Sequence, residues 1–187
     1  GTGLNTTSLE GVTASVEGDF LRRVLFFEND QKRVPQRLLK SLNWHPVRLL
    51  SHLESQRYYG AKKRYLSWMA GRALRRGGHD CFHGWSGDCF RALIEARRRG
   101  IPSVIDIPTW HRNKGKLKAG ETRTEREQRL GGRQSWLARL EISRLEMLAE
   151  YDLADVILVP SRKSAETFLA AGVREEKLHY VARGVDI

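Results

Sequence analysis

The sequence predicts an α/β fold, a Rossmann-like parallel sheet with flanking helices. Short apolar runs typical of buried strands alternate with amphipathic segments of helical length, which is the pattern of βαβ units. The Val-Ile-Leu-Val run at 156–159 fits a strand that is covered on both faces. The composition, 40% hydrophobic and 9% aromatic, is globular, and 187 residues suit one domain. We therefore expect residues 1–187 to form a single Rossmann-like domain.

The first half of the chain is expected to hold a strand, a helical region and a second strand. Residues 22–28 are an apolar run that ends in turn residues. Residues 36–77 follow a helical pattern that is interrupted near 43–47, and the longest helix ends on two glycines. A short strand at 80–83 then leads into a glycine turn.

The second half repeats the alternation of strands and helices. A helix that is capped by Ser86 or Asp88 ends at Gly100, and Ser161 caps a later helix. The remaining predicted elements are strands at 102–107, 155–160 and 178–182 and a helix at 135–154 with apolar residues at helical spacing.

The chain is strongly basic, with a net charge of +11 and a pI near 10.1, so its partner is expected to be anionic. Part of this charge lies in residues 108–133, which we interpret as a mobile basic loop. The loop leaves the carboxyl end of a predicted strand, where open α/β sheets bind ligands.

Several classes of protein do not fit the sequence. It has no apolar run of about 18 residues, no signal-peptide pattern at its start and only two cysteines, so we expect a reduced, cytoplasmic chain. It carries no recognised nucleic-acid motif, and no nucleic-acid partner is expected. A basic nucleic-acid or anionic-surface binding module on an α/β scaffold remains the alternative function.

A metal site is a second alternative, at His79, Cys81, His83 and Cys89. Residues two apart share one face of a strand, so the first three could face one way. Their spacing is not that of common zinc sites, and buried cysteines are often small apolar residues. We therefore expect no bound metal.

The second half also resembles the amino-terminal, acceptor-side lobe of glycosyltransferase family 4, whose members are retaining enzymes with the GT-B fold. The turn Phe-His-Gly-Trp-Ser-Gly at 82–87 resembles a bacterial branch of the family. The resemblance covers about the last 110 residues, and residues 1–78 match poorly. The other matching positions, in order, are Ala154, Asp155, Ser161, Gly172, Val173, Lys177, Leu178, Gly184, Val185 and Asp186.

The resemblance implies a transfer of a sugar, with retention, from a nucleotide-sugar donor to a glycan or lipid acceptor. It implies no metal and no cofactor, because basic groups and helix amino ends hold the donor diphosphate in this family. In the family a second lobe binds the donor. The sequence ends at Ile187, where the linker to that lobe would begin, so we expect the isolated chain to be an inactive half of a hexosyltransferase-type enzyme.

The resemblance also implies site residues. His83 is the candidate catalytic residue, expected at the carboxyl end of its strand beside a helix amino end that favours an anion. The candidate acceptor or cleft residues are Gly84, Trp85, Ser86, Trp110, His111 and Arg183. For each of these, a purely structural role is the alternative.

Residues 57–76 combine basic side chains with tyrosine and tryptophan. This combination suits the surface of an anionic membrane, which makes the inner face of the membrane an alternative location. A helix that packs its aromatic residues on the sheet is the competing interpretation.

Overall fold

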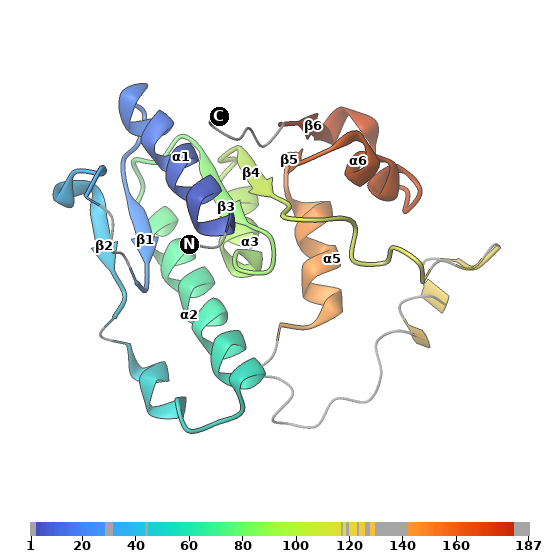
Figure 1. The fold of residues 1–187 in the computed structure, drawn as a ribbon, viewed down its shortest axis with the longest axis horizontal. Coiled ribbons are helices and arrows are strands. Elements are labelled where there is room, and N and C mark those ends of the chain that lie inside the picture. The colour runs from blue at the N-terminus through green and yellow to red at the C-terminus, as the bar shows by residue number, and fades with distance from the viewer. Residues whose placement is uncertain are drawn as a thin grey trace. The chain divides into compact units, whose positions relative to one another are not determined.

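The computed structural model describes residues 3–28, 32–43, 45–116 and 142–181, together with 118, 120–122, 124, 125, 128 and 129 (Figure 1). Two compact units, Gly1–Leu49 and Leu50–Ile187, divide the chain, and each is described by itself. The single Rossmann-like domain over 1–187 stays a prediction.

The first unit contains a helix and a small parallel sheet. Helix α1 (Gly3–Glu17) precedes strand β1 (Val24–Phe26), which pairs in parallel with β2 (Leu39–Ser41). The strand predicted at 22–28 is confirmed. No element was predicted where α1 lies.

The helical prediction for 36–42 is wrong. A single 3-10 turn, η1 (Gln36–Leu38), follows Pro35 and leads directly into β2. The amide of Leu42 then donates to the Phe26 carbonyl at 2.7 Å, which extends the pairing with β1. A second 3-10 segment, η2 (Pro46–Leu50), occupies the second short piece that was read as helical.

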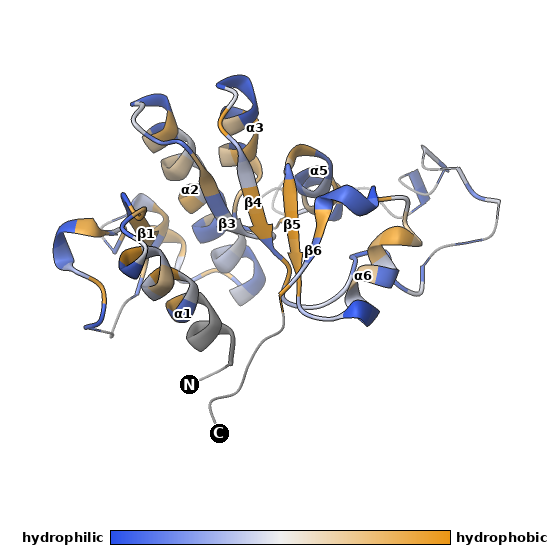
Figure 2. Ribbon diagram, turned by 90° about the horizontal axis from the view of Figure 1, so that it is seen from above, coloured by the Kyte–Doolittle hydropathy of each residue, from blue (hydrophilic) through white to orange (hydrophobic). Residues whose placement is uncertain are grey.

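The second unit is built on a four-stranded parallel sheet, and this confirms the predicted α/β class. Its strands, in spatial order, are β3 (Phe82–Trp85), β4 (Ser103–Asp106), β5 (Val156–Val159) and β6 (Leu178–Tyr180). In Figure 2 the most apolar strands, β4 and β5, lie between the other two.

Helices connect these strands in order, and η4 (Glu175–Lys177) precedes β6. Helix α2 (Ser55–Arg75) precedes β3, and the helices α3 (Phe90–Arg98), α5 (Arg144–Leu153) and α6 (Arg162–Leu169) lie between successive strands. Because each crossover between adjacent parallel strands has the same hand, α3, α5 and α6 cover the same face of the sheet. Their side chains Leu93, Leu148 and Phe168 pack with Ile105 and Ile157 in one core. In Figure 1, α2 runs beside α3.

Strand β3 lies two residues further along the chain than the 80–83 prediction. The error came from Gly84, which was read as a turn residue although it lies inside the strand. A Cβ on Gly84 would come within 2.9 Å of both Cys89 and Phe82, so glycine is required there for close packing. The turn glycine is Gly87, whose φ is +91°.

Two predicted helix starts are also wrong. Helix α3 begins after Cys89, and no side chain caps it, whereas Ser86 or Asp88 was expected. Helix α5 begins at Arg144, where Ser143 and Glu146 form a capping box, so the predicted helix does not extend through residues 142 and 143. Residues 135–141 lie outside the described residues. The cap at Ser161 is confirmed, because its hydroxyl accepts from the amide of Ser164 at 3.1 Å.

Two motif residues hold the sheet together. The Asp155 carboxylate accepts from the amide and the hydroxyl of Ser103, at 2.8 and 2.9 Å, and so joins the start of β5 to the start of β4. Ala154 is fully buried beside it. Both residues therefore support the architecture at the amino edge of the sheet, away from the edge where such sheets bind ligands.

Candidate functional site

The candidate site lies at the carboxyl edge of the four-stranded sheet, since all four strands end at this edge. The turn after β3, the segment after β4 and the start of α6 meet there, and the amino end of α5 returns to it. This is the edge at which open parallel sheets bind ligands.

His83 forms a pair with Asp106 from the neighbouring strand. The imidazole Nε2 lies 2.8 Å from the carboxylate Oδ2, and the His83 side chain is 47% exposed. The carboxylate can only accept, so Nε2–H donates and Nδ1 is left as an acceptor when the ring is neutral. The pair therefore fixes the tautomer and orientation of an accessible imidazole.

The position of His83 differs from the prediction. It is the second residue of β3 and not the residue that ends it. The register pairs His83 with Val104 and Trp85 with Asp106, so all four side chains lie on one face of the sheet. That face is opposite the one on which Ile105 and Ile157 pack against the helices.

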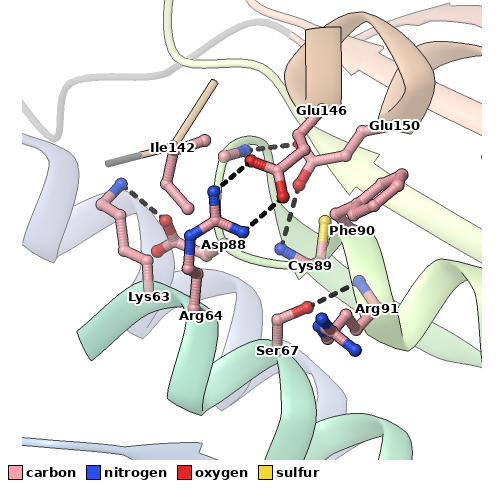
Figure 3. A pocket seen from close by; sticks show the side chains of 11 residues that line it. Lys63, Arg64, Ser67, Asp88, Cys89, Phe90, Arg91, Ile142, Glu146 and Glu150 are labelled. Atoms are coloured by element: carbon pink, nitrogen blue, oxygen red, sulfur yellow. Dashed lines mark hydrogen bonds and ion pairs between the residues drawn. The ribbon is translucent and has the colours of Figure 1, made fainter. Parts of the chain in front are cut away.

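The turn after β3 is held by a buried carboxylate. Glu150 of α5 is 1% exposed and accepts from the amides of Gly87 and Cys89 at 2.5 and 3.1 Å (Figure 3). The Ser86 hydroxyl lies 3.4 Å from the same carboxylate. Burial raises the pKa of Glu150, and the two amide hydrogen bonds oppose that rise. The backbone of the turn is thus fixed by a side chain from α5.

This arrangement corrects the expectation of an anion-binding helix start after His83. The Gly87 and Cys89 amides, which an external anion would use, already bind Glu150. A small pocket beside this turn is lined by Lys63, Arg64, Asp88 and Glu146, among others. In it the Lys63 ammonium lies 2.5 Å from the Asp88 carboxylate, and Arg64 makes two bonds of 2.5 and 2.6 Å to Glu146 (Figure 3). Burial raises the pKa of Asp88, while Lys63 lowers it by a smaller amount. Lys63, Arg64, Asp88 and Glu146 are therefore already paired with one another in this pocket.

The root of the basic segment is packed against α5 and α6. His111 is 4% exposed, and its ring lies 5.1 Å from that of Tyr151 and 5.0 Å from that of Phe168. Its Nδ1 accepts from the Asn113 amide at 3.1 Å, and its own amide donates to Thr167 at 2.9 Å. His111 therefore anchors the segment, and its contact with a ligand stays a prediction.

Trp110 is the accessible aromatic residue beside this anchor. It is 55% exposed, and the Lys114 ammonium lies 3.5 Å from the centre of its ring, within cation–π range. The remaining predicted residue, Arg183, lies outside the described residues.

The four possible metal ligands do not lie together as a set. Among the residues that the structure describes, no three His, Cys, Asp or Glu side chains form a group that could hold a metal ion. Cys81 is exposed and Cys89 is buried. Burial raises the pKa of both thiols, with further increases from Asp155 at Cys81 and from Glu150 at Cys89.

The two thiols are expected to react differently with a disulfide reagent. Because the thiolate is the reactive form, Cys81 should react with a disulfide reagent faster as pH rises, and Cys89 only after unfolding. Thiol titration over a range of pH checks this difference.

The purified protein is expected to hold no stoichiometric zinc, and metal analysis checks this. About one zinc per chain, lost in a Cys81→Ser/Cys89→Ser variant, would reverse the expectation.

Helix α2 packs its small residues and leaves aromatic residues accessible. Gly60, Ala61 and Gly71 are buried, while Tyr59 and Trp68 are exposed. The Lys62 ammonium lies 5.7 Å from the centre of the Tyr59 ring, and the guanidinium carbon of Arg72 lies 5.8 Å from the centre of the Trp68 ring. None of the described helices has the length and apolar character that crossing a membrane requires.

Three residues of the site were not identified from the sequence: Asp106, Glu150 and Tyr151. Asp106 carried a usable signal, a carboxylate closing an otherwise apolar strand. Glu150 carried a weaker one, an acidic residue between the buried side chains of Leu148 and Tyr151. Neither signal identifies a partner, because the partners lie more than 20 residues away.

The chain was compared with known protein families. A family model described as Glycosyltransferase Family 4 matches residues 23–187. The similarity thus includes most of the first 78 residues, where the sequence analysis found little. No curated protein matches the chain.

Proposed function

The chain belongs to glycosyltransferase family 4, and on this basis we propose that it supplies the acceptor-side lobe of a retaining glycosyltransferase. The complete enzyme would move a sugar, of hexosyl type, from a nucleotide-sugar to a glycan or lipid acceptor. The observation that carries the proposal is the His83–Asp106 pair, an oriented and accessible imidazole beside Trp85 on a parallel sheet of this family.

In this proposal each residue of the site has its own role in binding or in positioning. His83 contacts the reacting sugar or acceptor hydroxyl through Nδ1, while Asp106 holds the ring in the required tautomer. Trp85 and the exposed Trp110 offer apolar faces on which a sugar ring can stack. Glu150 keeps the turn after β3 in place. None of these roles uses a metal or a cofactor.

The donor lies on a second lobe in this proposal, so residues 1–187 alone are expected to show no turnover of nucleotide-sugars. An assay of nucleotide release compares this chain with the full-length, two-lobed protein. Release by the full-length protein alone supports the division between lobes. Comparable release by residues 1–187 would contradict it.

We also propose that α2 contacts the surface of an anionic membrane at the cytoplasmic face. The exposed Tyr59 and Trp68 with neighbouring Lys62 and Arg72 support this contact. Sedimentation with phosphatidylglycerol vesicles should fall at least about threefold in Trp68→Ala/Arg72→Gln and decline with added salt. Arg162→Gln, on the exposed side of α6, is the matched control. Equal losses in the control would show binding by net charge alone.

A further inference from the structure

Three arginines gather around the segment that follows β4. Arg144, the first residue of α5, donates to the Arg112 carbonyl at 3.0 Å. Arg129 donates to the Lys116 carbonyl at 2.8 Å. The two guanidinium groups thus hold the two ends of residues 112–116, and the side chain of Arg112 itself is exposed.

The positive charge of this cluster is only partly neutralised. Arg129 forms a two-bond pair with Glu121, at 2.6 and 2.7 Å. Within the described part of the chain, neither Arg112 nor Arg144 pairs with a carboxylate, and the buried Nε of Arg144 has no hydrogen-bond partner. Burial lowers the pKa of Arg144, and repulsion from Arg112 and Arg129 lowers it further. Holding like charges together costs free energy that an anion would offset.

The cluster lies beside the turn that follows β3. Burial raises the pKa of Tyr151, which is 3% exposed, while interactions with Ser86 and with the backbone of Arg112 lower it, so both residues lie close to its phenol oxygen. Ser86 in turn contacts Glu150. Arg112 therefore lies close to the turn directly after β3, with the buried Tyr151 between them, at the edge where open parallel sheets bind ligands.

The same segment contains a buried acceptor that lacks a donor. Asn113 is 3% exposed, and its carboxamide oxygen has no hydrogen-bond partner in the described structure. Buried polar atoms in native proteins are usually satisfied by protein, water or ligand. A bound hydroxyl or an ordered water is the kind of donor that would complete this segment.

We propose that Arg112, Arg129 and Arg144 form a binding site for a phosphate group carried by the acceptor. The identification of the ligand as the acceptor rests on the proposed function, whereas the phosphate site itself rests on the geometry of the three arginines. Guanidinium groups bind phosphate through pairs of charge-assisted hydrogen bonds, which makes arginine the favoured residue for such groups. The phosphate could belong to a soluble phosphorylated sugar or to a lipid headgroup.

Calorimetric titration of the chain tests the site, with inorganic phosphate and glycerol 3-phosphate as probes. Arg112→Gln/Arg144→Gln should weaken binding at least about tenfold, because two charge-assisted contacts are lost. The matched control is Arg98→Gln, an exposed arginine at the end of α3 and so at the opposite edge of the sheet. It should leave binding unchanged within about twofold. Thermal melting confirms that each variant is folded.

Vesicles distinguish the two sources of phosphate. Phosphatidylcholine vesicles with and without phosphatidic acid are sedimented with the same variants. Binding that needs both phosphatidic acid and the two arginines assigns a lipid acceptor. Binding of the soluble probes alone assigns a soluble phosphorylated acceptor.

The proposal fails if no probe binds, or if Arg98→Gln weakens binding as much as the double variant. The first result would show that the three arginines form no phosphate site, and the second would show that net charge explains the affinity. Because these titrations measure binding without transfer, their failure leaves the proposed transferase function standing. Conversely, arginine-dependent phosphate binding in a full-length protein that releases no nucleotide would support the site and contradict the transferase.

Discussion

In the full-length, two-lobed protein, His83→Ala is expected to lower sugar transfer by about tenfold or more, equivalent to at least ~1.4 kcal/mol of transition-state stabilisation. The imidazole is accessible, and its one polar contact in the described structure is to Asp106. Its removal should therefore change folding little. Steady-state kinetics and thermal melting of the same variant measure both effects.

Two further variants separate a role in transfer from a role in packing. Asp106→Asn keeps the shape of the pair, but its amide can donate to Nε2 and so favours the other tautomer of His83. It should lower kcat with melting unchanged. His52→Ala removes an exposed histidine elsewhere and should be silent. Near-normal activity of His83→Ala, or a melting change that accounts for all of its lost activity, would make His83 structural.

Glu150→Ala is expected to destabilise the chain by about 3 kcal/mol. The substitution leaves the buried amides of Gly87 and Cys89 without an acceptor, and each unsatisfied group costs about 1–3 kcal/mol. Urea denaturation measures the loss as a lower midpoint. Glu166→Ala, which removes an exposed carboxylate paired with Lys163, is the control and should cost below about 0.5 kcal/mol. A similar cost for both variants would contradict the assigned role of Glu150.

The pH dependence of stability gives a second test of Glu150. Burial raises its folded-state pKa above the ordinary value, so folding displaces its equilibrium toward the protonated form relative to the unfolded chain. Its contribution is therefore fully present below the ordinary pKa of a glutamate and is lost as pH rises through the raised pKa. The stability difference between the native chain and Glu150→Gln should decrease over that range. Asp88, whose pKa is also raised, is present in both proteins, and its charge contributes to the raised pKa of Glu150.

The strands of the main sheet could be predicted because their signals are local. The run at 156–159 is apolar and is followed by Pro160 and the capping Ser161, so its type and its end follow from neighbouring residues. The predicted parallel arrangement followed from the helices between the strands. These signals need no knowledge of distant contacts.

The missed features depend on residues that are far apart in the sequence. The three residues of strand β2 would fit a short helix equally well by their composition. They form a strand because they pair with β1. The shift of β3 follows from the close packing of Gly84 against Cys89 and Phe82. Glu150 reaches amides more than 60 residues away. Tertiary contacts of this kind decide boundaries and partners after local propensity has been satisfied.

The most direct test of the proposed function is the anomeric configuration of the sugar in the product. The full-length protein is incubated with α-linked nucleotide-sugars and a panel of phosphorylated and unphosphorylated sugar and lipid acceptors, and the product is read by NMR. The proposal predicts an α-linked product that forms in the presence of a chelator and is strongly reduced in His83→Ala. A β-linked product, or transfer that is unaffected by loss of His83, would contradict a retaining transferase that uses this site.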